Sequence, residues 1–417
     1  MKRLGGRHQV LGMAVLLAFI TYLDRVAISM TAPAIMKDLT LTPVQMSFIF
    51  SAFTIAYALF EAPTGWWGDR VGPRRVLTRI VVWWSTFTMA TASAIGFGSL
   101  ATLRFLFGAG EAGAWPNVAK ALSRWFPSSE RGTAQGIFFM GAHLGGGITP
   151  LLVAVLTQRM GWRAVFVIFS LFGFAWALAW WIWFRDDPAE HRAVSAEELR
   201  YIQAGYTEPD HHSSAFAMLA DPSIIAICAA YFTQGYGFYF YITWLPTYLQ
   251  QAKGLNAGMM GLLAGLPLLL SVVADLAGGL TTDRLTKKFG FRIGRCAVAG
   301  VSLAVSAIAI AGAASVGVSV FGAILIAIGA ASSNFLLGAS WGACVDISGP
   351  NAGFISAAMN TAGQIGGTLS PIAYAWISQT WSSAYALGLI AGLYLFGGFC
   401  WIWVRPPRVH VISSEIE

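Results

Sequence analysis

Four charged residues lie deep inside long apolar segments of the sequence: Asp24, Arg25, Arg104 and Glu111. Glu61 and Asp275 lie inside two other such segments, closer to their ends. A charge at the centre of a bilayer costs at least about 2.5–3.5 kcal/mol, so a charged residue inside a spanning segment is a candidate for function. Arg104 and Glu111 are seven residues apart, which places them on one helix face, about 10 Å from each other. We expect a third group from another span, such as Asp24, to lie between them and complete a ladder of charges.

This predicted cluster fits either a static or a dynamic role. A buried ion pair can join two helices, but the cost of desolvating both charges often cancels their attraction. Two buried carboxylates near arginines can instead exchange protonation for ion pairing as water access changes, which is what proton coupling requires. We therefore expect Asp24, Glu111 and Arg104 to take part in proton coupling.

Arg25 follows Asp24 directly, and neighbours on a helix point about 100° apart. Asp24 can therefore face Arg104 while Arg25 faces a central cavity, where a guanidinium binds a carboxylate or phosphate through two parallel hydrogen bonds. The alternative for Arg25 is a salt bridge to a polar residue of another span. Tyr22 and Tyr57 either pack against lipid or line a pocket for a hydroxylated ligand.

His143 is the one histidine inside a predicted span. An imidazole can titrate near neutral pH, but a histidine in a glycine-rich segment is more often a hydrogen-bonded packing residue, and both roles stay open. The sequence contains no P-loop, His-Glu-x-x-His helix or Gly-x-Ser-x-Gly elbow. We therefore expect no enzymatic activity, no metal and no cofactor, and energy from an ion gradient rather than from ATP.

The elements that must position these residues are membrane-spanning helices. Apolar residues make up 56% of the 417 residues and charged residues only 11%, against about 25% charged in a soluble domain. A span needs about 20 apolar residues. Stretches of that length predict an all-α membrane protein with twelve transmembrane helices, near 9–33, 44–66, 77–95, 100–122, 132–156, 162–184, 222–250, 256–281, 294–313, 317–344, 352–378 and 382–404.

The twelve spans divide into two halves that resemble each other. The segment Gly65–Arg70 recurs as Gly279–Arg284, 214 residues later. Parallel duplication of a six-helix unit is a known transporter design, with the substrate site between the halves. We expect six-helix bundles at 1–184 and 221–417, joined by a hydrophilic linker at 185–220 in which Ser195 and Glu198 form a capping box for a short helix.

The repeated loops suggest a gate. Asp69, Arg70, Asp283 and Arg284 occupy matching places in the two halves. A carboxylate is stabilised at a helix N-terminus, and Asp69 lies where the third span should begin. Releasing that contact would free one bundle from the other, although a solvated basic turn is the alternative.

Positive charge predicts the orientation. Twenty of the 26 Lys and Arg residues lie at the two termini and in alternate loops, so both termini should be cytoplasmic. This pattern also explains the net charge of +7 without a nucleic-acid partner. The apolar N-terminal segment is too long for a signal peptide and lacks a small-residue cleavage site, so we interpret it as the first span.

Several motifs resemble one family. The Gly65–Arg75 loop resembles the signature of the major facilitator superfamily. Tyr22-Leu-Asp24-Arg25 and the segment from Arg104 to Pro116 resemble the anion:cation symporter family within it, as do Trp125–Gly132 and the linker segment Ala196–Ile202. That family includes bacterial symporters of galactonate, glucarate and hexuronates, and animal transporters of glutamate and sialic acid.

The resemblance implies roles for individual residues. Asp24 and Glu111 would be the protonated carboxylates, with Arg104 as their charge partner, and Arg25 would hold the substrate carboxylate. The pocket wall would be formed by Tyr22, Tyr57, Ser340, Trp341 and Asn360. Where sugar-acid members tend to have glutamine in the fifth span, this chain has Ala142 followed by His143, so the pocket can differ from the galactonate type. We therefore count His143 among the expected substrate-binding residues of the pocket.

The sequence thus favours a proton-coupled symporter that imports a small organic anion, such as a hexonate, hexarate or hexuronate, and works as a monomer in a bacterial inner membrane. Another carboxylate, such as an aromatic acid or a dicarboxylate, is an alternative substrate. An exchanger of an organic anion against phosphate would be favoured by a second deep arginine in the C-terminal half, where none is found. A membrane sensor that binds the anion without moving it is the remaining alternative.

Overall fold

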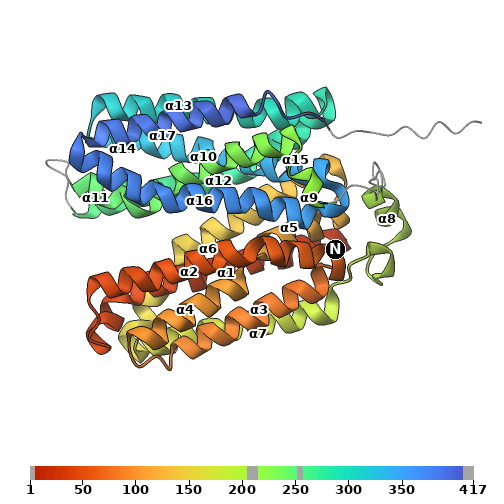
Figure 1. The fold of residues 1–417 in the computed structure, drawn as a ribbon. Coiled ribbons are helices and arrows are strands. Elements are labelled where there is room, and N and C mark those ends of the chain that lie inside the picture. Colours follow the sequence, from red (N-terminus) through yellow and green to blue (C-terminus); the bar gives the residue numbers. More distant parts are fainter. Residues whose placement is uncertain (1–4, 204–214, 251–256, 407–417) are drawn as a thin grey trace, which may run out of the picture.

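The structure of the chain is a computed structural model that describes residues 5–203, 215–250 and 257–406. This described part is helical apart from turns and short connections. Figure 1 shows the helices in two groups, α1 to α7 in one and α10 to α17 in the other, with α8 to one side. The expected all-α architecture of two six-helix bundles is confirmed.

Each bundle is built from long apolar helices. The N-terminal bundle contains α1 (Gly6–Asp38), α2 (Pro43–Val71), α3 (Pro73–Thr91), α4 (Phe97–Glu111), α5 (Ala114–Trp125), α6 (Arg131–Met160) and α7 (Trp162–Trp183). The C-terminal bundle contains α10 (Pro222–Thr243), α11 (Leu245–Gln250), α12 (Ala257–Phe289), the π-helix η3 (Arg292–Ala297), α13 (Val298–Val316), α14 (Val320–Phe335), α15 (Leu337–Ser348), α16 (Ala352–Thr380) and α17 (Ser383–Cys400).

Three of the twelve expected spans are interrupted, and a fourth begins with a π-helical segment. The fourth consists of α4 and α5, because Gly113 has a φ of 83° that only glycine adopts without strain. The seventh and tenth divide into α10 with α11 and α14 with α15, and the ninth begins with η3. By length and composition, seven stretches of described helix can cross a membrane, and one of them, 320–378, runs from α14 through α16.

The two most extensive contacts between the bundles join α2 with α16 and α6 with α12. Close approach requires glycine at both seams. A Cβ added to Gly65 would lie 2.6 Å from the carbonyl oxygen of Gly353, and a Cβ on Gly279 would lie 2.6 Å from that of Gly132. Small residues let helix backbones approach in this way, so the repeated glycines of the two loop motifs hold the bundles together.

The linker contains the expected helix, α8 (Ala196–Gln203), and Ser195 Oγ accepts a hydrogen bond from the backbone N–H of Glu198. The Glu198 side chain does not complete the capping box. It accepts instead from the backbone N–H groups of Gly6 and Arg7, at the start of α1. Linker residues 204–214 lie outside the described part, and the bounds 1–184, 185–220 and 221–417 remain a proposed division.

Candidate functional site

The site centres on Arg25, in the middle of α1. Its guanidinium forms an ion pair from Nε to Oε1 of Glu111, the last residue of α4. The Glu111 side chain is 1% exposed and that of Arg25 is 16% exposed, so solvent reaches the arginine side chain but hardly the carboxylate. Four aromatic rings surround the guanidinium carbon, with centroids 4.9–5.7 Å away: Tyr22, Phe53, Tyr57 and Trp115.

Asp24 and Arg104 are buried beside this pair. Asp24 lies within electrostatic range of Glu111 and Arg104. Among the described residues, neither carboxylate oxygen of Asp24 has a hydrogen-bond partner, and Nε of Arg104 has none. The structure therefore brings the four predicted charges together, but the direct partner of Glu111 is Arg25 rather than Arg104. One arginine–carboxylate contact is formed although the site has two arginines and two carboxylates. One carboxylate therefore remains available to a proton, and one guanidinium remains available to an anion.

His143 faces both the site and the other bundle. Its ring centroid is 6.1 Å from that of Tyr22, and its Nδ1 is 2.5 Å from Oδ2 of Asp275 on α12. Both side chains are buried. The alternative of a hydrogen-bonded packing residue fits the contact, but the partner lies across the bundle interface. The sequence marked Asp275 only as a charge inside a span, and it gave no signal for this pairing.

The remaining residues predicted for the pocket wall are mostly bonded to other protein groups. Asn360 Nδ2 donates to Oε1 of Glu61, a buried acid on α2. Trp341 Nε1 donates to the hydroxyl of Tyr231 over 2.9 Å. Ser340 Oγ is buried without a hydrogen-bond partner in the described part of the chain.

One contact near the site was not foreseen. Tyr239 on α10 donates from its hydroxyl to Oε1 of Gln364 on α16 over 2.8 Å, and it lies within electrostatic range of Arg25. It belongs to the aromatic run 236–241, which was the available signal. Through Tyr239, the C-terminal bundle places a side chain near Arg25.

The repeated loop motifs join the bundles at the end that carries the N-terminus and α8, which we term the basic end (Figure 1). Asp69 accepts hydrogen bonds from the N–H groups of Gly353 (3.0 Å) and Phe354 (2.8 Å), at the start of α16. It also pairs with Lys120 at 2.5 Å. The sequence placed Asp69 at the start of the third span, but α2 continues to Val71, so Asp69 caps a helix of the other bundle instead.

Asp283 occupies the matching position. It accepts from the N–H groups of Gly132 (3.0 Å) and Thr133 (2.5 Å) at the start of α6, and it pairs with Arg295 at 2.8 Å. Arg131 pairs with Asp346 at 2.6 Å, which adds a third link between the bundles. The arginines of the motif point elsewhere: Arg284 and Arg70 are exposed, and the Arg70 guanidinium lies 4.0 Å from the ring of Trp66.

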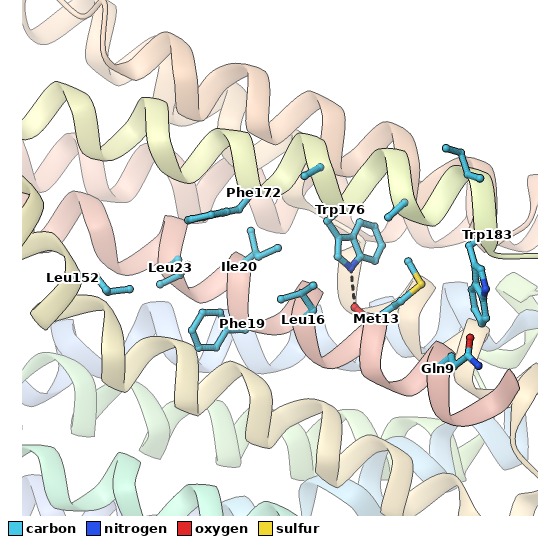
Figure 2. Close-up of a pocket in the computed structure, with 13 residues that line it drawn as sticks. Gln9, Met13, Leu16, Phe19, Ile20, Leu23, Leu152, Phe172, Trp176 and Trp183 are labelled. Carbon is cyan, nitrogen blue, oxygen red and sulfur yellow. Dashed lines mark hydrogen bonds between the residues drawn. The ribbon is translucent and has the colours of Figure 1, made fainter. Parts of the chain in front are cut away.

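A separate groove runs along the outside of the N-terminal bundle (Figure 2). It lies between α1 and α7 and is lined almost entirely by apolar side chains, among them Leu16 and Phe172, which are about half exposed. Its one hydrogen bond in Figure 2 runs from Trp176 Nε1 to the carbonyl oxygen of Met13 over 2.8 Å. None of the described residues that line this groove has a charged side chain, so they do not offer the chemistry of the Arg25 site.

Residues 14–371 match the Major Facilitator Superfamily. The chain belongs to this superfamily. It is 34% identical over 411 residues to a probable sulfoacetate transporter of Cupriavidus necator, covering 97% of this chain and 95% of the relative. It is 33% identical over 408 residues to a hexuronate transporter of Bacillus subtilis, covering 95% and 94%.

A solved structure shows the same fold. The proton:xylose symporter XylE superposes with a TM-score of 0.78 at 13% sequence identity, covering 96% of each chain. At this identity the likeness concerns the fold alone. Membership of the superfamily makes the protein a multi-pass membrane transporter rather than an enzyme, and the Arg25 site lies between its two bundles.

Proposed function

We propose that this protein is a proton-coupled symporter that moves a small organic anion into the cell by alternating access. The observation that carries the proposal is the ion pair between Arg25 and Glu111. A carboxylate of the protein occupies the guanidinium that would hold the substrate, so substrate and Glu111 compete for one cation. Protonation of Glu111 removes its charge and frees the guanidinium for an incoming carboxylate or sulfonate.

Asp24 and Arg104 extend this coupling. Unpaired buried charges are costly, and Asp24 lacks a hydrogen-bond partner among the described residues. Protonation therefore stabilises Asp24 whenever Arg104 does not neutralise its negative charge. We assign Asp24 and Glu111 as proton carriers, Arg104 as the charge that balances them, and Arg25 as the anion-binding residue. The rings of Tyr22 and Tyr57 lie 5.7 and 4.9 Å from its guanidinium carbon.

Two substrate classes follow from the relatives and from the pocket. The hexuronate transporter supports a sugar acid. A compact anion with few hydroxyls, as in the sulfoacetate transporter, is favoured by a specific observation. Three polar groups expected on the pocket wall are already bonded to protein partners: His143 to Asp275, Asn360 to Glu61 and Trp341 to Tyr231. Fewer groups are then left for substrate hydroxyls.

An exchanger of an organic anion against phosphate is less well supported. Such a site would need a second cavity arginine in the C-terminal bundle. The described part of that bundle has four arginines. Arg284 and Arg405 are exposed, Arg292 donates to the carbonyl oxygens of Ile402 and Val404, and Arg295 pairs with Asp283 and Asp346. The proposed orientation, with the basic end in the cytoplasm, is supported by the charge distribution, and we propose that a single chain carries out transport.

The coupling is tested with Glu111→Gln in proteoliposomes. Glutamine imitates the protonated acid and cannot release a proton, so this variant should exchange labelled substrate across the membrane but fail to accumulate it under a pH gradient. Uphill accumulation at the wild-type level would remove Glu111 from the coupling role. Asp38→Asn, which alters an exposed acid paired with Arg163, is the matched control and should accumulate substrate normally.

The substrate class is tested by a thermal-shift screen of purified protein. Sulfoacetate, glucuronate, galactonate and glucarate form the panel, with xylose as an uncharged control. Stabilisation by sulfoacetate alone would support the compact anion, and stabilisation by the sugar acids would support the hexonate and hexuronate class. Stabilisation by xylose but by no anion would contradict the anion assignment.

A further inference from the structure

The groove between α1 and α7 lies between two membrane-spanning helices. Gly6–Ala32 and Trp162–Trp183 are two of the described stretches that are long and apolar enough to cross a bilayer. Large apolar side chains of the groove are exposed on its walls, among them Leu16, Phe172 and Ile182. On a span, exposed apolar side chains face hydrocarbon rather than water. The groove is therefore a hollow in the surface that lipid covers.

Two small side chains create the hollow. Ala175 and Ala179 are four residues apart on one face of α7, and both line the groove. Their neighbours on that face, Phe172 and Trp176, are large, and Leu152 on α6 adds a third wall. The hollow has a volume of about 840 Å³, within the range of about 300–1,000 Å³ that ligand pockets commonly have. It is thus large enough to hold a ligand.

The length of the groove exceeds the depth of one lipid leaflet. Figure 2 shows Gln9 and Trp183 at one end of the groove and Leu23 and Leu152 at the other. From position 9 to position 23 of α1 is about 21 Å along the helix. Half of a hydrocarbon core of about 30 Å is about 15 Å. An acyl chain that enters beside Gln9 and Trp183 can therefore lie in the groove over the whole depth of its leaflet.

The Gln9 end of the groove lies at the basic end of the molecule, where α1 begins and α7 ends. Trp183 is the last residue of α7 and is half-buried there. Tryptophan is enriched where a span meets the membrane–water interface, because the indole combines an apolar ring with an N–H donor. This mouth of the groove therefore lies at the depth of the lipid headgroups.

A cation lies at the mouth. Nη1 of Arg185 donates over 2.9 Å to the carbonyl oxygen of Ile182, a residue that lines the groove. The next residue, Asp186, accepts from the backbone N–H of Arg74 and pairs with Arg124 at 3.8 Å. In the described part of the chain, no carboxylate forms an ion pair with Arg185. Its charge is thus available to an anion at the mouth of the groove.

We propose that this groove binds one anionic phospholipid, with an acyl chain between α1 and α7 and the phosphate at Arg185. An unfilled hollow would leave its lining side chains without contacts on one side, and a flexible chain can follow its shape. A guanidinium binds a phosphate through two parallel hydrogen bonds. A zwitterionic lipid offers the same phosphate but adds a positive charge near Arg185, so the site prefers a lipid with net negative charge.

The bound lipid would contact the helix that carries the Arg25 site. Leu23 lines the far end of the groove and directly precedes Asp24 and Arg25 on α1. A ligand that binds the folded protein raises its melting temperature, so the anionic lipid should stabilise the delipidated protein in detergent. The inference depends neither on the substrate nor on the proton coupling proposed above.

Native mass spectrometry of the delipidated protein tests the proposal by counting bound lipids. The probes are phosphatidylglycerol, which is anionic, and phosphatidylethanolamine, which is zwitterionic, with identical acyl chains. At low lipid concentration the wild type should bind one phosphatidylglycerol and prefer it to phosphatidylethanolamine by about fivefold, the effect of one basic residue on an anionic lipid.

Two variants separate the headgroup from the chain. Arg185→Gln should abolish the preference, whereas Arg405→Gln, which alters an exposed arginine after the last helix of the other bundle, should keep it. Ala179→Trp should fill the groove and lower the affinity for both lipids. Leu178→Trp is its control and should bind as the wild type does, because Leu178 is 62% exposed and does not line the groove.

Photolabelling locates the chain in the wild type, so a variant that fails to fold does not decide the result. Phosphatidylglycerol with a diazirine in its acyl chain should label α1 and α7 at the groove in preference to other lipid-facing helices. Label spread evenly over α1, α7, α13 and α17 would mean surface lipid only and would overturn the site.

Three further results would each overturn the proposal. The first is equal binding of the two lipids by the wild type. The second is wild-type behaviour of Arg185→Gln or of folded Ala179→Trp, because the site requires both the headgroup and the chain. The third is a dimer in the same spectra that Ala179→Trp removes, because a second copy of the chain would then occupy the groove.

Discussion

The charges at the Arg25 site balance when all four groups are ionised. Asp24 and Glu111 then offset Arg25 and Arg104, and the site has no net attraction for an anion. Each proton that binds an acid adds one positive charge. Since Arg25 and Glu111 are in contact, the first proton that reaches Glu111 both changes the net charge and releases a guanidinium. We therefore expect proton binding and anion binding to favour each other at the scale of single residues.

Arg25→Ala should abolish uptake and weaken anion binding strongly. Removing one partner of a desolvated, hydrogen-bonded charge pair costs about 2–5 kcal/mol, which corresponds to a loss of affinity of about thirtyfold or more. Arg25→Lys should also fail, because an ammonium does not reproduce the planar fork of the guanidinium. Isothermal titration calorimetry with the anion selected by thermal shift measures both effects.

The control for this prediction is Arg163→Ala, which removes an arginine that is 45% exposed and paired with Asp38 at the opposite end of the bundle. Its affinity should match the wild type. Near-normal binding by Arg25→Ala would show that the anion site lies elsewhere.

Among the elements, the interrupted helices position the site. α4 ends at Glu111, and the chain turns at Ala112 and Gly113 before α5 begins. This break places the Glu111 carboxylate at a helix end beside α1. The tenth span is interrupted at the single residue Leu336, between α14 and α15, and near this point Asn334 donates to Ser271 and accepts from Gln234. The C-terminal bundle thus has neutral amides near the break where the N-terminal bundle has charges.

The break at Gly113 should not tolerate a side chain. Its φ of 83° disfavours residues other than glycine, and an added Cβ would lie 2.6 Å from Cβ of Thr64 on α2. We expect Gly113→Ala to lower the melting temperature by several degrees and to reduce transport. Gly98→Ala in α4 is the control, since an added Cβ there meets nothing within 4 Å. Equal melting temperatures for the two variants in detergent would contradict the role of this break.

At the scale of the whole molecule, the two bundles differ in their buried charges, but each contacts the other through a matching aspartate. Asp69 and Asp283 each cap a helix of the opposite bundle, α16 and α6 respectively. We propose that access from the basic end requires both caps to release. The charge that crosses the membrane in one cycle is set in the N-terminal bundle, where both proposed proton carriers lie.

The two carriers predict how voltage acts on transport. If Asp24 and Glu111 each carry one proton and Arg25 binds one monovalent anion, a cycle moves a net charge of +1 inward. A potential of about 100 mV, negative inside, then contributes about 2.3 kcal/mol, or roughly fiftyfold accumulation. A potassium diffusion potential set with valinomycin in proteoliposomes, at equal pH on both sides, measures this. Accumulation of a monovalent anion that ignores the potential would mean that one of the two carboxylates is structural.

The sequence by itself determined the spans, their division into two groups of six, and which charged residues lie inside the spans. These are local properties: a run of about 20 apolar residues crosses a bilayer wherever it lies, and a charge within it is costly whatever its partner. The capping residue of the linker helix was equally local, and the Ser195 bond is present as expected.

Only the tertiary structure decided which charges meet. Arg25 rather than Arg104 contacts Glu111, His143 faces Asp275, Asn360 faces Glu61, and Asp69 caps α16 rather than α3. Each pairing joins helices that are distant in the sequence. Its geometry depends on how each helix is rotated about its axis and how closely the glycine-lined seams let two backbones approach, and neither quantity is contained in the pattern of any one segment.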